Sequence, residues 1–492
     1  MPLPLGFIAW LALARPIGII SRLEPQEAFR AAYFYSFMAN LFHLYWVAVV
    51  TPPGMVAAIF VLSLYPAVVM TAFVRLYRIK KILGMIALPF LWVGMEYFRS
   101  LSEFAFPWTD LSYSQGYYLI FIQIVSVLGC YGLSFILVIM NMLVWRVIDG
   151  SNRLEARING AVALVVVAAA VFVYGWIVYP PVKEVGDFRV SMLQGNVDLS
   201  TKWNPQTRDY NFELYDSLAR VAAEDEPRLI VWPETAAPTY PRQEPGYLRK
   251  LYYTAAGSGT PNLVGALDIV YYPDKKKSYN AAFQISPTGR IDAVHHKIEL
   301  VPFSEHSPYQ DYVPFLTREY LSKYLDIIRT REVQWWSDFY PGDSIVIFEA
   351  GGRRYAVLIC FESAFPEQVR QCLLKGADFM VNITNDTWFG RSAGPFQHMR
   401  IAVFRAVENR VWMARCANSG ISAFIDPYGR EVHRAGLYVQ KVISADVGAV
   451  SDYSVFTRLG PVVGQVSFVV LLLIMGGLII GRVVGRIRRG GR

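Results

Sequence analysis

The run Tyr355-Ala-Val-Leu-Ile-Cys360-Phe-Glu362-Ser decides the fold of the segment around it. Its successive apolar residues predict a buried strand, and the thiol of Cys360 stands at the end of that strand. A lone cysteine in an apolar strand is more often inert packing than a nucleophile. The choice between these two interpretations depends on the rest of the chain.

From about residue 186 to 450, β-rich runs alternate with amphipathic helical patterns and turn signals. This alternation predicts an α/β layered domain, and roughly 260 residues are enough to bury a core. The expected helices are 207–224, 365–375 and 395–410. The expected strands are 188–194, 229–232, 262–270, 281–285, 355–360, 379–383 and 421–425.

The composition of the whole chain is that of a polytopic membrane protein with one sizeable soluble domain. Of its 492 residues, 54% are hydrophobic and only 17% are charged. Apolar runs near the roughly 20 residues that a bilayer requires lie on both sides of the α/β segment. The first contains Arg15 and Pro16, so we expect a tilted or partly interfacial helix there. The expected spans are 5–20, 33–50, 56–76, 83–100, 118–145, 159–179 and 463–484.

The formal net charge of +8 is explained by membrane topology rather than by nucleic acid. Basic residues cluster beside the apolar runs, at 75–81, 146–157 and 482–489, on the side that we therefore expect to be cytoplasmic. We expect a bundle at 1–180, an α/β domain at 186–450 in the periplasm of a bacterium, and a C-terminal helix at 460–485 that ends in the cytoplasm. Six expected spans precede the α/β domain, and an even number of spans puts the N-terminus on the same, outer side as that domain. We therefore expect that a first helix upstream of Met1 is missing.

Four cysteines, Cys130, Cys360, Cys372 and Cys416, are scattered without a C-x-x-C pair or a histidine cluster at metal spacing. The sequence therefore supports neither a disulfide framework nor a zinc site, and we expect no metal and no cofactor. Cys372 and Cys416 lie in ordinary helix and strand patterns. We interpret both as structural.

Three chemically useful residues end strands or follow them directly, which is where catalytic groups gather in α/β folds. Glu234 closes Leu229-Ile-Val-Trp-Pro-Glu, Lys297 follows Ile291-Asp-Ala-Val-His-His, and Cys360 ends its own run. A carboxylate can take the proton of a thiol, and an ammonium can stabilise a developing oxyanion, so the three together indicate acyl transfer. Taken singly, Glu234 can be a solvated strand-end carboxylate and Lys297 a surface charge.

In this order, Glu234, Lys297 and Cys360 resemble the Glu-Lys-Cys triad of the nitrilase superfamily. The surrounding runs are similar to those of the apolipoprotein N-acyltransferases, the membrane-bound relatives of the nitrilases. In the α/β segment these runs are Gln194-Gly-Asn196, Lys202-Trp203, Val231-Trp-Pro-Glu234, Lys297-Ile-Glu-Leu-Val-Pro-Phe-Ser-Glu305, Asn385-Asp-Thr-Trp-Phe-Gly390, Gln397-His398, Arg405-Ala-Val-Glu-Asn409 and Asn418-Ser-Gly-Ile-Ser422. In the membrane half they are Glu96-Tyr-Phe-Arg99, Phe106-Pro-Trp108, Tyr113-Ser-Gln115 and Tyr131-Gly-Leu-Ser-Phe135.

The resemblance implies a nitrilase-like αββα domain on a helical membrane bundle. It implies that an acyl chain passes from a phospholipid, through a thioester on Cys360, to the α-amino group of a diacylated apolipoprotein. Glu234 would act as base and Lys297 would hold the oxyanion. Glu305 would orient Lys297 or assist proton transfer, and Glu362 would shape the pocket, although either can be a structural ion-pair partner instead. We expect a monomer with no nucleic acid partner.

The chain departs from the family pattern at three points. Family members usually have eight spans, Tyr where this chain has Phe361, and Gly where it has Ser304. The segment from His306 to Tyr340 is rich in aromatic residues, including Trp335 and Trp336, and is long for a loop, which favours a functional lid that admits acyl chains. Trp203 lines the same entrance or packs in the core.

The membrane motifs have structural interpretations. We expect Glu96 and Arg99 to form a buried or interfacial ion pair, and Phe106-Pro-Trp108 to be an interfacial aromatic anchor. Two other functions stay open. One is a membrane-tethered nitrilase-type hydrolase that uses water as the acceptor, and the other is a catalytically silent lipoprotein-binding protein.

Overall fold

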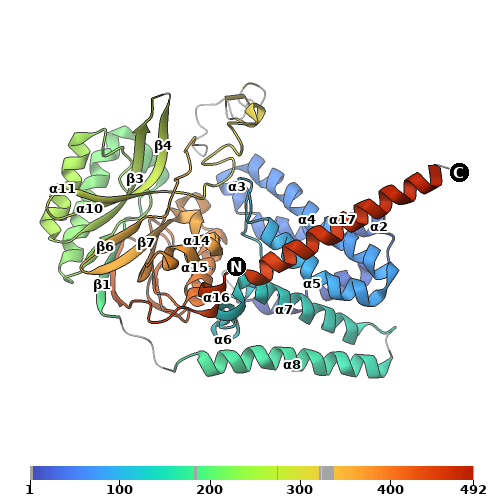
Figure 1. Ribbon diagram of the computed structural model, residues 1–492. Coiled ribbons are helices and arrows are strands. Elements are labelled where there is room, and N and C mark those ends of the chain that lie inside the picture. Colours follow the sequence, from blue (N-terminus) through green and yellow to red (C-terminus); the bar gives the residue numbers. More distant parts are fainter. Residues whose placement is uncertain are drawn as a thin grey trace. The chain divides into compact units, whose positions relative to one another are not determined.

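The computed structural model describes residues 4–151, 153–181, 186–273, 275–317, 319–320, 323 and 337–490. The chain divides into two compact units (Figure 1). One consists of Met1–Tyr179 and Leu459–Arg492, and the other is Pro180–Arg458. The first unit is helical, and the second contains the strands.

Among the described residues, five helices are long and apolar enough to cross a membrane. They overlap the predicted spans from 56–76 onward. In α8 and α17, only 11% of the most apolar window is buried within the protein, which leaves these side chains for contact with lipid. The five are α4 (Pro52–Ile79), α5 (Lys81–Phe98), α7 (Val125–Ile148), α8 (Leu154–Val178) and the Val462–Val484 part of α17 (Val462–Gly490).

The two N-terminal spans take a different form from the predicted one. Residues 5–20 are not one helix, because the chain breaks at 11–13 between a 3-10 helix and a seven-residue α-helix. Asn141 of α7 forms hydrogen bonds with the backbone groups that this break leaves free. Its side-chain amide donates to the carbonyl of Ala9 at 2.7 Å and accepts from the N–H of Leu13 at 2.8 Å. In place of 33–50, a helix runs over Pro25–Leu44 and starts at a capping box. The elements of this region are η1 (Gly6–Trp10), α1 (Ala14–Ile20), α2 (Pro25–Leu44), α3 (Val47–Val50), η2 (Leu111–Gln115) and α6 (Leu119–Ile122).

The buried polar groups of the helical unit hold α5 to the segment that follows it. Arg99 pairs with Asp110 at 2.7 Å, rather than with Glu96 as we expected. Glu96 instead accepts hydrogen bonds from the indole N–H of Trp92 and the backbone N–H of Leu111, both at 2.9 Å. Both groups are buried and tied to neighbouring segments, so the structural interpretation stands although the expected pairing was wrong.

Two further features of the helical unit concern its aromatic residues and its packing. Trp108 is buried in the unit and packs against Trp46 at 5.5 Å between ring centroids, so within this unit it is a packed core residue.

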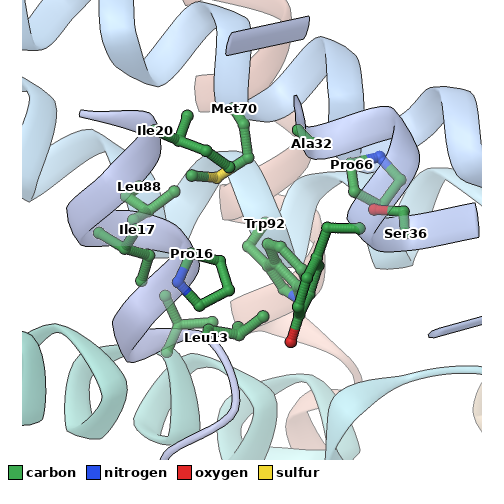
Figure 2. Close-up of a pocket in the computed structure, with 12 residues that line it drawn as sticks. Leu13, Pro16, Ile17, Ile20, Ala32, Ser36, Pro66, Met70, Leu88 and Trp92 are labelled. Carbon is green, nitrogen blue, oxygen red and sulfur yellow. The ribbon is translucent and has the colours of Figure 1, made fainter. Parts of the chain in front are cut away.

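A small apolar cavity lies among residues of α1, α2, α4 and α5, including Pro16, Met70 and Trp92 (Figure 2). Its volume of about 20 Å³ has room for a water molecule but not for an acyl chain.

The α/β unit contains two six-stranded sheets built on the same plan within the described residues. In each, three parallel strands lie between antiparallel ones. The first has the order β12-β1-β2-β3-β4-β5, with β1 (Phe188–Gln194), β2 (Leu229–Val231), β3 (Asn262–Tyr271), β4 (Lys276–Ile285), β5 (Ile291–His296) and β12 (Lys441–Val447). The second has the order β11-β10-β9-β8-β7-β6, with β6 (Ile347–Ala350), β7 (Arg353–Ile359), β8 (Phe379–Thr384), β9 (Met413–Ala417), β10 (Ser422–Ile425) and β11 (Glu431–Ala435).

The two sheets pack face to face with helices outside them, in the expected αββα order (Figure 1). Alternate side chains serve different layers: Val231 points into the core between the sheets, and Ile230 points into the core beneath α10 and α11. The helical elements are α9 (Leu199–Trp203), η3 (Pro205–Thr207), α10 (Arg208–Ala223), α11 (Pro245–Ser258), η4 (Pro314–Leu316), η5 (Cys360–Ala364), α14 (Pro366–Leu374), η6 (Asp386–Phe389), α15 (Gly394–Asn409) and α16 (Val455–Leu459).

Candidate active site

The three predicted catalytic residues come together from three strand ends. Glu234 follows β2, Lys297 follows β5, and Cys360 opens η5 directly after β7, which ends at Ile359, one residue earlier than predicted. The Nζ atom of Lys297 lies 3.7 Å from Oε1 of Glu234. The charges of both residues act on the Cys360 thiol. One base, one cation and one thiol therefore share a site.

Cys360 occupies a strained turn. Its φ angle of +54° lies in the left-handed region, which residues other than glycine rarely adopt. A strand-to-helix turn of this kind exposes a nucleophile at the top of a sheet in other α/β enzymes. Burial and the negative charge of Glu234 raise the pKa of the thiol, and the Lys297 charge only partly offsets them. The thiol is therefore protonated at rest and needs a base.

The carboxylate of Glu234 is fixed through both of its oxygens. Asn280 on β4 donates its side-chain amide to Oε1 at 2.7 Å, and Asn385 donates its backbone N–H to Oε2 at 2.8 Å. Beneath the Glu234 turn lies Gly265 of β3, where a Cβ atom would approach the carbonyl oxygen of Pro233 to 2.3 Å. The base is thus held by contacts from both sheets.

Lys297 is buried and forms a bidentate ion pair with Glu305. Its Nζ lies 2.8 Å from Oε1 and 2.7 Å from Oε2 of that carboxylate. Burial opposes the charged form of Lys297, but Glu305 and Glu234 outweigh burial and raise its pKa. Asn280 reaches Glu305 as well, at 3.2 Å, so one amide group contacts both carboxylates. The bidentate contact with Lys297 gives Glu305 the geometry that its predicted role of orienting Lys297 requires.

Glu362 fastens the Cys360 turn to the Lys297 segment. Its two oxygens accept the backbone N–H groups of Ile298 at 2.7 Å and Ile359 at 2.6 Å, and Oε1 also accepts from Gln368 at 2.7 Å. Burial raises the pKa of this carboxyl, but the ring of His295, 3.5 Å away, and the hydrogen bonds from these backbone groups outweigh burial and lower it. Glu362 is therefore an ionised clamp between these two segments, and its predicted role in shaping a pocket stays a prediction.

A buried polar network that the sequence did not predict supports the carbonyl of Cys360. His398 Nε2 lies 3.1 Å from that oxygen, and its Nδ1 lies 2.9 Å from Oδ1 of Asp386. Arg415 donates to Oδ2 of Asp386 at 2.8 Å and also to the side chain of Asn382. All of these side chains are buried. The network therefore fixes the strained turn from the side of the second sheet.

Comparison with known proteins places the chain in a family. The Apolipoprotein N-acyltransferase N-terminal domain matches residues 1–143, and the Carbon-nitrogen hydrolase domain matches residues 189–451. An apolipoprotein N-acyltransferase of Geobacter metallireducens is 35% identical over 470 residues, which cover 92% of this chain and 88% of that protein. The chain belongs to the apolipoprotein N-acyltransferase family. This confirms the predicted enzyme class, an acyltransferase, and the predicted fold class.

Other relatives extend the comparison. An apolipoprotein N-acyltransferase of Chlorobaculum tepidum is 31% identical over 480 residues, covering 92% of this chain and 87% of that protein. Among solved structures, a mutant of the Nesterenkonia AN1 amidase from the nitrilase superfamily is 18% identical, with a TM-score of 0.40. It covers 57% of this chain and 96% of its own.

The remaining predicted site residues of this acyltransferase differ in how closely they approach the triad. Phe361 is buried and packs edge to face on Phe365 at 5.2 Å between ring centroids. Trp203 is half-buried at the end of α9, and its neighbour Lys202 contacts Glu234. Trp335 and Trp336 lie outside the described residues. The entrance role of these aromatic residues therefore stays a prediction.

The described parts of the predicted lid adjoin the catalytic segment of the acyltransferase. The backbone N–H of Ser337 donates to the carbonyl of Ser304 at 2.7 Å, and that of Phe339 donates to the carbonyl of Glu305 at 2.8 Å. Tyr312, from the earlier part of the segment, is 83% exposed. The segment is thus tied at one end to the backbone that carries the Lys297 partner.

The other cysteines of the α/β unit are packed away from this chemistry. Cys416 is buried, with its sulfur 3.4 Å from the carbonyl oxygen of Val231, and Cys372 is buried in α14. Burial raises the pKa of both thiols. Their surroundings fit the structural role that we expected.

Asn280 had a detectable signal in the sequence. It is an amide in the middle of a strand whose other central residues are apolar, and a buried amide needs hydrogen-bond partners. Asn385 begins one of the runs that resemble the family, but its contact with Glu234 had no signal of its own, because it is made by a backbone N–H, which every residue except proline has.

Proposed function

We propose that this acyltransferase completes lipoproteins by moving an acyl chain from a phospholipid to the α-amino group of their N-terminal diacylglyceryl-cysteine. The acyl chain passes through a thioester on Cys360. The observation that carries the proposal is the convergence of Glu234 and Lys297 on the Cys360 thiol. The names of the relatives support the acceptor, because they are apolipoprotein N-acyltransferases.

In the first half-reaction, Glu234 takes the proton of Cys360 while the sulfur attacks the ester carbon of the phospholipid. The ammonium of Lys297 and a backbone N–H near Cys360 stabilise the oxyanion of the tetrahedral intermediate. When the intermediate collapses, the ester C–O bond breaks and the leaving oxygen takes the proton from Glu234. A lysophospholipid departs, and the acyl chain stays on sulfur.

In the second half-reaction, the α-amine of the diacylated apolipoprotein attacks the thioester carbon. Glu234 takes a proton from the amine, the C–S bond breaks, and the thiolate of Cys360 recovers that proton. The product is an amide, and the enzyme returns to its starting state. Glu305 keeps Lys297 in place through both steps by its bidentate contact.

We further propose that the bundle lies in the bacterial inner membrane, with the catalytic unit in the periplasm and the C-terminus in the cytoplasm. The distribution of Lys and Arg in the short loops supports this orientation. Reporter fusions after residues 150 and 490 should both report a cytoplasmic location, and a fusion within 186–450 a periplasmic one. The protein acts as a monomer, which light scattering of the detergent-solubilised enzyme would test.

The deciding experiment supplies the reconstituted enzyme with a phospholipid labelled in its acyl chain and then adds a diacylated lipopeptide. We expect a labelled thioester on Cys360 that discharges onto the peptide amine. Transfer that survives Cys360→Ala would overturn the proposal. Release of labelled fatty acid without labelled peptide would support a hydrolase instead, and a Cys360 that is never acylated would support a silent binding protein.

A further inference from the structure

Lys202 is a buried lysine next to the proposed base that neither half-reaction uses. Only 2% of the residue is exposed, and its Nζ donates to the backbone carbonyl of Glu234 at 2.9 Å. Lysine is almost never fully buried unless it is paired, because desolvation of an ammonium is costly. The hydrogen-bond partner of the Lys202 ammonium is a neutral carbonyl, which offsets this cost less than a carboxylate would. A lysine that served packing alone could be replaced by an apolar residue.

The carbonyl that Lys202 holds belongs to the turn that presents the base. Thr235, the next residue, has a φ angle of +47°, so the turn is strained. Asn280 and Asn385 fix the two carboxylate oxygens of Glu234, and Lys202 fixes its main chain. Without Lys202, a buried carbonyl in a strained turn would lose its hydrogen bond.

The main chain of Lys202 is itself anchored. Its N–H donates to the carbonyl of Asp198 at 2.9 Å, and its carbonyl accepts from the buried side chain of Asn211 at 3.3 Å. The residue thus links α9, which ends in Trp203, to the Glu234 turn. Helix α9 and the turn that carries the base are therefore joined through this one residue.

Two titratable groups act on Lys202, namely Glu234 and Cys360. Burial lowers the pKa of the Lys202 ammonium to about 7, although both groups act to raise it. The ring of Trp203, with its centroid 5.8 Å from Nζ, also favours the cation. Lys202 therefore changes charge close to neutral pH, whereas Lys297 keeps its charge.

We propose that Lys202 is a positioning residue for acylation of Cys360, whose ammonium holds the Glu234 turn in place through its hydrogen bond to the Glu234 carbonyl. The inference rests on the proposed acyl transfer, because there Glu234 is the base. Protonated Lys202 donates a charge-assisted hydrogen bond to this carbonyl. When the Lys202 ammonium loses its proton, the neutral amine donates a weaker hydrogen bond to the carbonyl.

The test follows the first half-reaction alone. The enzyme is mixed with phospholipid without an acceptor from pH 5.5 to 9, and the thioester on Cys360 is measured by mass spectrometry in a single turnover. For the natural chain, we expect a rate that falls as the pH rises through about 7, since Lys202 loses its proton there. Lys202→Met, which is apolar and of similar length, should acylate at least tenfold more slowly and lose this alkaline fall.

A matched control is Lys250→Met, which removes a lysine on α11 that pairs with Asp209 outside the site. Its rate and its pH profile should equal those of the natural chain. Lys202→Arg, which stays charged at every pH tested, should retain activity at pH 9 relative to its own value at pH 6. This variant and the profile of the natural chain keep the test informative if Lys202→Met does not fold.

The outcomes separate this inference from the proposed function. If the natural chain forms no thioester on Cys360, the proposed acyl transfer itself fails. If it does and Lys202→Met matches it in rate and profile, only the role of Lys202 is overturned. A slower Lys202→Met with an unchanged alkaline fall would also overturn the inference, because the loss would then be structural.

Discussion

The backbone N–H of Asn385 donates to Oε2 of Glu234 at 2.8 Å and so joins the two sheets at the proposed catalytic centre. Asn385 follows β8 of the second sheet, and Glu234 follows β2 of the first. The triad is divided in the same way, because Lys297 follows β5 and Cys360 follows β7. Small displacements of reacting groups cost large factors in rate, so the packing of the sheets is itself part of the catalytic geometry.

Asn280→Asp should slow acylation of Cys360 about 10²-fold at pH 7.5. The new carboxylate would lie where an amide now donates to Glu234 at 2.7 Å and to Glu305 at 3.2 Å. Like charges this close cannot all stay ionised, so a proton would be captured among them. Because the introduced carboxyl group can donate again once it is protonated, the defect should shrink as the pH falls, which single-turnover mass spectrometry would measure.

The matched control for that substitution is Asn204→Asp, an exposed residue whose side chain accepts from the N–H of Gln206 at 2.9 Å. Aspartate caps a helix as well as asparagine does, so acylation should be unchanged. Equal rates for Asn280→Asp and the natural chain would show that the amide does not set the geometry of the carboxylates.

Gly265→Ala should reduce acylation by about 10²-fold or more, and it should also destabilise the α/β unit. An added Cβ would lie 2.3 Å from the carbonyl oxygen of Pro233 and 2.7 Å from Cα of Glu234, so the backbone of the base would have to move. The rate of thioester formation and the thermal midpoint measure the two effects. In the control Gly257→Ala, nothing lies within 4 Å of the new Cβ in α11, so stability should be kept or increased by up to about 1 kcal/mol. Full activity of Gly265→Ala would show that the backbone of Glu234 does not depend on the close approach of residue 265.

Glu362→Ala should lower the free energy of unfolding by about 3 kcal/mol and abolish acylation. It removes the acceptor of two backbone N–H groups and of the Gln368 amide in a buried site. Denaturant unfolding in detergent measures the first effect. Glu367→Ala is the control, because its carboxylate is half-exposed, its ion pair with Arg370 is partly screened by water, and it should contribute less than about 1 kcal/mol. Similar losses of unfolding free energy in both variants would contradict the role of Glu362 as a clamp between the two segments.

The buried network behind Cys360 predicts a defined acid sensitivity. Burial raises the pKa of Asp386, but Arg415 and His398 outweigh it and hold the pKa at about 2, below the unfolded value of about 3.9. A carboxyl with a depressed folded pKa stabilises the fold fully above the unfolded value. That contribution, about 2 kcal/mol, is lost as the pH falls from about 4 to 2.

Asp386→Asn should therefore be less stable than the natural chain at pH 5 and should show a flatter decline between pH 4 and 2. The thermal midpoint in detergent, measured at steps of half a pH unit, tests this. Asp225→Asn is the control, because it changes an exposed carboxyl group just beyond the end of α10. An unchanged slope in Asp386→Asn would show that other carboxyl groups cause the acid sensitivity.

Where hydrophobic pattern and local chemistry agree, the sequence predicted the elements well. Each predicted strand is part of an observed strand or overlaps one, and the three predicted helices match α10, α14 and α15 within two residues at each end. Strands β6, β9, β11 and β12 were missed, and β9 was missed because Arg415 interrupts its apolar run. The charge is tolerated there only because Asp386 pairs with it from another element.

The N-terminal helices were harder to predict. Hydropathy favoured one span over 5–20, yet the chain breaks where Asn141, more than a hundred residues away, can satisfy the freed backbone groups. No local pattern records such a partner.

The sequence by itself determined the family and the α/β and membrane segments, and it singled out the three residues Glu234, Lys297 and Cys360 that the fold brings together, because periodicity and motif spacing are local properties of the chain. The tertiary structure alone decided which groups surround these positions. Asn280, Asn385 and Lys202 reach Glu234 from three different elements, and Glu362 joins two segments more than sixty residues apart. These contacts depend on how two sheets pack, which is set by the whole buried core and not by any single run of residues.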